Sequence, residues 1–133
     1  MIFLNDIKQY LQKKGITYPI YVLNLPAKPN NCITLFEYEG LPSEIEAQTV
    51  SPGLQLLLRV DNADIENGYE QIYKAVEILE QIGFEGGELP EGVTINNTQY
   101  LNVVAQGSGL IPLGKDDNGC NIFTKNFYVT KER

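Results

Sequence analysis

The 133-residue chain contains no histidine, no tryptophan and a single methionine, and only two of its residues are cysteines. Without histidine, no cysteine or serine can pair with the imidazole base that activates such nucleophiles in many enzymes. The papain-like and serine-hydrolase arrangements are therefore excluded for the two cysteines and for Ser43, Ser51 and Ser108. Because the chain shows no secretion signal, Cys32 and Cys120 are expected to be reduced thiols, with a disulfide as the alternative.

Long hydrophobic runs and an excess of positive charge are also missing. No apolar run approaches the ~20 residues that cross a membrane, and the first residues lack the basic leader of a signal peptide. Acidic side chains outnumber basic ones by 17 to 10, giving a net charge of -7. Nucleic-acid binding needs a basic stripe, so neither a membrane nor a specific nucleic-acid sequence is an expected partner.

Three stretches have the composition of ligand-binding loops but not the context. The glycines of 107–109 lead into a proline rather than a helix, and those of 85–88 lie between glutamates that would repel phosphate. Residues 116–119 (Asp-Asp-Asn-Gly) lack the alternating ligands and the later glutamate of a calcium loop. They predict a hairpin turn, with a metal site as the minor alternative. No metal or cofactor is expected.

Carboxylates are the remaining candidates for catalysis. General acid catalysis favours a carboxyl group in an apolar setting, and none of the candidates is flanked by apolar residues on both sides. An acidic, solvated loop is the preferred interpretation, and an enzyme that uses carboxylates alone stays a minor alternative. The carboxylates concerned are Glu37, Glu39, Glu44 and Glu46.

Hydrophobic periodicity predicts two amphipathic helices and four to five strands. The clearest helix begins at Ile65 and ends at Gly83, because its apolar residues recur at spacings of three and four. The clearest strand is 53–60, where four apolar residues alternate with Gln55, Leu57 and Arg59. A second helix is predicted over 2–14, and further strands over 20–25, 32–38, 98–105 and 120–131.

These elements predict an α+β fold. Short connections between neighbouring strands favour a mainly antiparallel sheet, and both helices are expected to pack on one face of it. Residues 39–52 and 106–114 are expected to be irregular loops because they are rich in polar residues, glycine and proline. No linker or repeat divides the chain, so residues 1–133 are predicted to form a single domain.

Four stretches taken together resemble a known group of proteins, the minor capsid proteins of tailed bacteriophages. Through them the chain is similar to tail terminator and head–tail joining proteins, and the likeness covers nearly its whole length. The stretches are 21–26 with the proline-rich loop after it, 37–42 (Glu-Tyr-Glu-Gly-Leu-Pro), 54–60 (Leu-Gln-Leu-Leu-Leu-Arg-Val) and 112–127.

The resemblance implies a non-enzymatic virion assembly protein. Such proteins form rings, commonly hexamers, that cap the tail tube or dock the tail to the head. The implied partners are other copies of the chain, the tail tube and head-completion or connector proteins, and DNA is expected to pass through the ring. The implied location is the head–tail junction of the virion, after assembly in the host cytoplasm.

Two kinds of contact surface follow as expectations. The mixed face of the strand 53–60, formed by Gln55, Leu57 and Arg59, is the candidate oligomer interface. The acidic loop with Glu44 and Glu46 and the glycine-rich segment with Ser108 and Leu110 are candidate docking loops. The alternative function is a small protein-binding or regulatory module encoded by a bacterial (prophage) genome.

Overall fold

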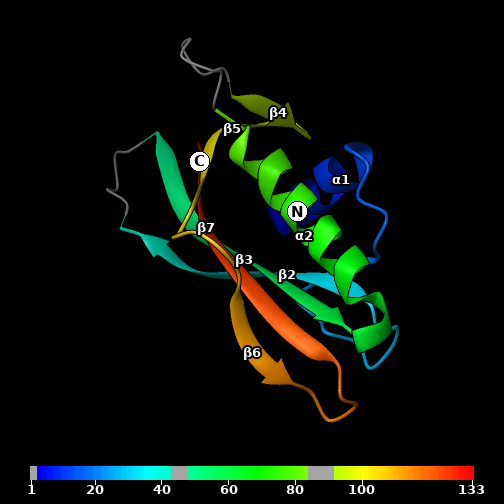
Figure 1. Cartoon of the computed structure of the whole chain (residues 1–133). Helices are drawn as coiled ribbons and strands as arrows, with labels where there is room; N and C mark the ends of the chain where they lie inside the picture. The colour runs from blue at the N-terminus through cyan, green and yellow to red at the C-terminus, as the bar shows by residue number, and fades with distance from the viewer. Residues whose placement is uncertain (1–2, 43–47, 84–91) are drawn as a thin grey trace.

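The computed structural model describes residues 3–42, 48–83 and 92–133 (Figure 1). Two helices and seven strands make up this part of the chain. In chain order they are α1 (Phe3–Lys13), β1 (Ile20–Val22), β2 (Cys32–Leu41), β3 (Thr49–Val60), a short 3₁₀ turn (Asn62–Asp64), α2 (Ile65–Glu80), β4 (Val93–Ile95), β5 (Thr98–Ala105), β6 (Ile111–Lys115) and β7 (Asn121–Glu132).

One curled sheet contains all seven strands. Its order is β1-β2-β3-β7-β5-β4, and β6 pairs with the first half of β7, beside the position that β5 occupies along the second half. Every pair is antiparallel except β1 with β2. The predicted α+β class and mainly antiparallel sheet are confirmed, although the sheet has more strands than the four to five expected.

Both helices pack on the same face of the sheet, as predicted (Figure 1). Leu54, Leu56 and Leu58 of β3 point into this layer and are fully buried against α1 and α2. The two helices supply apolar stripes to the same core, including Ile7 from α1 and Ile72 from α2. The helix-covered face therefore holds the hydrophobic core, and both helices of the described chain leave the opposite face of the sheet free.

The ends of α2 follow from local chemistry. The 3₁₀ turn before it is capped by Asp61, whose carboxylate accepts a hydrogen bond from the Asp64 N–H at 2.9 Å. After the helix, Gly83 adopts a φ of 84°, which an L-residue rarely takes, so the predicted stop at this glycine is confirmed. The loop predicted after it falls mainly on residues 84–91, which lie outside the described residues.

The loop predicted over residues 39–52 is wrong at both ends. Strand β2 continues to Leu41 and β3 begins at Thr49, and a bulge brings Leu41 opposite Ser51. Gly40 makes the bulge feasible, because a Cβ there would lie 1.9 Å from the Ser51 carbonyl oxygen. Residues 43–47, including Glu44 and Glu46, lie outside the described residues.

Two short strands were not predicted. Strand β4 joins β5 through Asn96 and Asn97, both with positive φ, which is the two-residue hairpin turn that asparagine tolerates. Strand β6 occupies residues 111–115, so the loop expected over 106–114 ends at Leu110. The turn predicted after β6 is confirmed: the Asp116 carboxylate accepts from the Asn118 and Cys120 N–H groups at 3.0 and 2.9 Å.

Candidate functional site

The face of the sheet without helices consists of rows of side chains that run across the strands. Residues paired directly across neighbouring strands project to the same face, so the register defines the rows. Leu57 lies at the centre of one row, with Thr34 of β2 on one side and Thr124 of β7 on the other. The three rows are Tyr21–Thr34–Leu57–Thr124–Ile111, Phe36–Gln55–Asn126, and Tyr38–Gly53–Tyr128–Val104.

The loop of residues 23–31 covers one end of this face. It connects the parallel strands β1 and β2, so it must run back along the sheet. Thr34 Oγ1 donates to the Asn24 carbonyl oxygen at 3.1 Å, and Arg59 Nη2 donates to that of Pro29 at 2.5 Å. Arg59, one of the predicted interface residues, is consequently only 4% exposed, and its Nε has no hydrogen-bond partner among the described residues.

At the other end of the face, none of the described loops lies over the strands in the same way. Gln55 and Leu57, the other two predicted interface residues, are half-buried there. Val104 is 54% exposed, and Phe36 and Tyr128 are half-buried. We call these five residues the sheet-face patch; none of them carries a charge.

The polar groups of the patch and of its immediate neighbours bond mainly to one another. Gln55 Nε2 donates to Asn126 Oδ1 at 3.1 Å. The ring of Tyr38 lies over Gly53, where a Cβ would approach its Cζ to 2.6 Å. The Tyr38 hydroxyl donates to the Phe127 carbonyl oxygen at 3.3 Å and accepts a hydrogen bond from Gln106. The side chain of Tyr38 thereby links β2 to β7 across the bare backbone of β3.

The predicted docking residues Ser108 and Leu110 lie in the loop between β5 and β6. Ser108 is exposed, whereas Leu110 is half-buried and packs against the core. Lys125 holds the loop from the helix side of the sheet, where its Nζ donates to the Gly107 and Gly109 carbonyl oxygens at 2.5 and 2.9 Å. The structure thus separates these residues from Gln55 and Leu57, which project from the opposite face.

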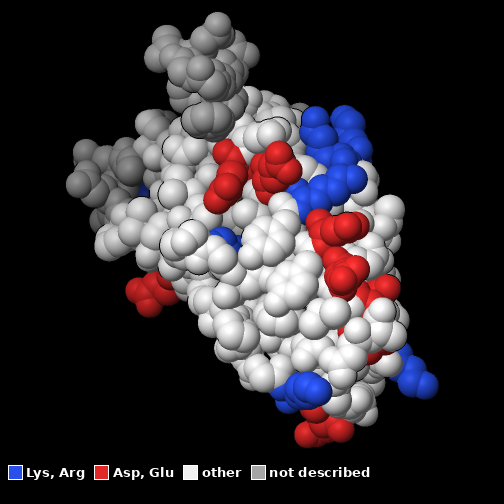
Figure 2. Space-filling view, viewed as in Figure 1, with Lys and Arg blue, Asp and Glu red and all other residues white. Residues whose placement is uncertain are grey.

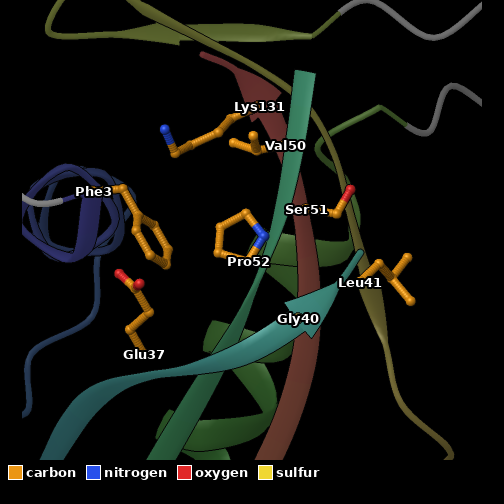
Figure 3. A pocket seen from close by; sticks show the side chains of 8 residues that line it. All are labelled: Phe3, Glu37, Gly40, Leu41, Val50, Ser51, Pro52 and Lys131. Atoms are coloured by element: carbon orange, nitrogen blue, oxygen red, sulfur yellow. The ribbon is translucent and has the colours of Figure 1, made fainter. Parts of the chain in front are cut away.

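A hollow of about 410 Å³ opens beside the first turn of α1 (Figure 3). The carboxylate of Glu37 and the ammonium of Lys131 project on the same side of β3 as the Phe3 ring. Ser51 points to the other side, and its hydroxyl hydrogen-bonds to that of Thr130 at 3.1 Å. Among the described residues that line the hollow, no base therefore lies beside the serine.

The two cysteines are free thiols, as predicted, and both are buried. Burial raises the pKa of the Cys32 thiol, although the Arg59 guanidinium acts in the opposite direction. Burial also raises the pKa of Cys120, and Asp116 adds to the effect. Both thiols are thereby kept in the protonated form, which is the weakly nucleophilic one. Within residues 3–42, 48–83 and 92–133, no three side chains among cysteine, aspartate and glutamate gather as metal ligands could.

Sequence reasoning identified Gln55 and Leu57 but missed the rest of the sheet-face patch. Phe36 could have been predicted, because the aromatic residues Phe36 and Tyr38 alternate with the charged Glu37. Successive residues of a strand point to opposite faces, so the two aromatic residues share one face. For Tyr128 and Val104, the signal is weaker because their pairing depends on the register of distant strands. Nothing in the strand pattern predicts that the 23–31 loop covers Arg59.

Comparison with known proteins adds the final observation. No curated protein matches the chain. A model of the family described as bacteriophage tail terminator protein matches residues 10–133, which is nearly the whole chain. No helix in the described ranges is long and apolar enough to span a membrane. The fold agrees with the α+β architecture expected from the resemblance, and the chain belongs to the bacteriophage tail terminator protein family.

Proposed function

We propose that the chain forms a ring, most simply a hexamer, that ends the phage tail tube and prepares it for joining to the head. Family membership gives it a role in phage tail assembly, together with other structural proteins of the phage. In the proposed role it acts as one domain at the head–tail junction of the virion. It is assembled in the host cytoplasm, its ring lets DNA pass, and no step is catalytic.

The observation that carries the proposal is the family match over residues 10–133. The sheet-face patch supports self-association, because a half-exposed apolar face without charge is suited to contact with protein. A ring requires a heterologous interface that closes, and a rigid sheet is a suitable element to fix its angle.

The test is negative-stain electron microscopy of a lysate from a phage or prophage that lacks this gene. Overlong tails beside free heads would support tail termination. Tails of normal length that fail to join heads would instead favour a head-completion connector or minor capsid role. Ordinary infectious particles would overturn both and favour a small protein-binding or regulatory module.

A further inference from the structure

We propose that the sheet-face patch binds residues 23–28 of a second copy of the chain. This contact rests on the proposed ring and names the two surfaces through which it closes. The first surface is the sheet-face patch together with Ile111 at its edge. The second is the loop that follows β1, which we call the loop ridge and define as residues 23–28.

The distribution of exposed hydrophobic side chains points to these two surfaces. In the described part of the chain, seven large hydrophobic residues are exposed, and five of them lie at opposite ends of the strand order. Leu23 and Leu25, 55% and 36% exposed, follow β1 at one end. At the other end lie Val104 on β5 with Ile111 and Leu113 on β6. Two different apolar surfaces on opposite edges produce a head-to-tail contact, which closes into a ring if the rotation permits.

Charge favours a second copy as the occupant. Each copy carries a net charge of -7, so contact between two copies is favoured where carboxylates are absent. Figure 2 shows acidic side chains gathered over the helix layer, which includes the exposed Glu66, Glu70, Glu77 and Glu80 of α2. The sheet-face patch has no charge, and the only charged residue of the loop ridge is Lys28, a cation that an acidic neighbour attracts.

Desolvation of the patch would also cost little. Burying a polar group without a partner is expensive, whereas a group already hydrogen-bonded loses less when water leaves. Gln55 and Asn126 are bonded to each other, and Tyr38 is bonded to Phe127 and Gln106. A neighbouring leucine or proline can therefore cover these side chains without taking away their hydrogen bonds.

The experiment uses two variants, each of which removes one surface. Val104→Asp introduces a charge into the patch, and Leu25→Asp introduces one into the loop ridge. Native mass spectrometry of the full chain should show oligomers for the wild type. Each variant alone should be monomeric, because the dissociation constant of the contact should rise at least ~100-fold. An equimolar mixture should form a heterodimer, because one intact patch and one intact loop ridge remain.

Tyr73→Asp is the matched control. Tyr73 is 46% exposed on α2, on the helix side, and stacks on Tyr69 with ring centroids 6.2 Å apart. This variant should assemble like the wild type. Leu57→Glu, at the centre of the patch, should behave like Val104→Asp if circular dichroism shows that it folds. Val104→Asp keeps the test decisive if it does not, because residue 104 is more than half exposed.

Several outcomes would overturn the inference. Folded variants that stay monomeric when mixed would mean that the two surfaces do not bind each other. Loss of assembly in Tyr73→Asp alone would mean that the interface lies on the helix layer. A wild-type chain that is monomeric at all concentrations would refute the contact. In phage complementation, Val104→Asp that still ends tails normally would refute this surface and leave the proposed function standing. Normal tails without the gene would refute the function itself.

Discussion

At the scale of single residues, one buried carboxylate joins the N-terminal helix to the far edge of the sheet. Asp6 of α1 is only 6% exposed and accepts hydrogen bonds from Tyr100 Oη at 2.6 Å and Asn96 Nδ2 at 2.8 Å. Asn96 lies in the β4–β5 turn, and Tyr100 is fully buried on β5. Asp6 thus fixes the position of α1 against a part of the sheet about 90 residues later in the chain.

Tyr100→Phe should therefore destabilise the fold, although the aromatic side chain at residue 100 stays in place. The Asp6 carboxylate would lose one of its two partners in a buried setting, which typically costs about 1–3 kcal/mol. Urea denaturation should show the loss as a lower midpoint. Tyr73→Phe removes a hydroxyl from an exposed ring and is the control. An unchanged midpoint for Tyr100→Phe would mean that water replaces the hydroxyl at no cost.

The buried tyrosines also predict how stability depends on pH. Burial, reinforced by the hydrogen bond to Asp6, raises the pKa of Tyr100 above its ordinary 10.0, and burial and Asp64 raise that of Tyr18. A pKa that is higher in the folded chain gives stability that is complete below the unfolded value and is lost above it. The free energy of unfolding should therefore fall as pH rises beyond about 10. Cys32 and Cys120, with pKa values raised from 9.0, add to this fall.

Urea midpoints measured between pH 8 and pH 11 would check this dependence. The fall should be shallower in Tyr100→Phe, because the substituted ring cannot ionise in the unfolded chain. The comparison is made relative to each variant's own midpoint at pH 8, so the lower stability of Tyr100→Phe does not confuse it. An equally steep fall in both proteins would remove Tyr100 as a source of the effect.

At the scale of elements, α2 approaches β3 closely because residue 68 has no side chain. A Cβ on Gly68 would lie 2.7 Å from Val60 Cγ2 and 3.1 Å from Val60 Cβ. Both residues are buried, so neither atom can move into solvent. The glycine lets the helix lie nearer to the sheet than an alanine would allow, at the expense of helix propensity.

Gly68→Ala tests which effect is larger. On helix propensity alone, alanine would stabilise by roughly 1 kcal/mol. The clash with Val60 should exceed this gain, so we expect net destabilisation by about 1–3 kcal/mol in urea or thermal unfolding. The double variant Gly68→Ala with Val60→Ala should recover part of the loss, because the clashing methyl groups are gone. Net stabilisation by Gly68→Ala alone would show that the helix can move away.

The elements also show where sequence patterns are sufficient. The spacing in α2 and the alternation in β3 predicted both elements and their buried sides, because one regular period extends through each. On β5 a strict alternation would place Leu101 on the face of Val103 and Tyr100 on the other, and the structure differs. A bulge between Tyr100 and Asn102 puts Tyr100 on the core face with Val103. A single extra residue reverses the alternation, and it depends on pairing with β7 rather than on the local sequence.

At the scale of the whole molecule, the candidate site depends on contacts that are distant in sequence. Leu57 and Gln55 were predictable from β3 alone, whereas Val104 joins them only because β7 lies between β3 and β5. Arg59 follows the same alternation as Gln55 and Leu57, and yet the 23–31 loop buries it. The sequence therefore predicts which face is mixed but not which part of that face stays uncovered.

The net charge of -7 makes a prediction for the assembly as a whole. Copies brought together in a ring repel one another through their carboxylates, and salt screens this repulsion. If apolar surfaces form the contact, self-association should strengthen several-fold between about 20 mM and 300 mM NaCl. Sedimentation at a series of salt concentrations would measure it. Weaker association at high salt would mean that ion pairs dominate the interface.

The position of β7 within the sheet affects the order in which the protein can fold during synthesis. This strand lies between β3 and β5 and also pairs with β6, and all three precede it in the chain. The leucine-rich β3 is made about sixty residues earlier, so at ~5–20 residues per second it waits roughly 3–12 s for its neighbour. Until then, a β2–β3 hairpin formed by the nascent chain would leave the other edge of β3 unpaired. The risk of aggregation during synthesis is therefore greatest before β7 has been made. A chain truncated before β7 cannot complete the sheet.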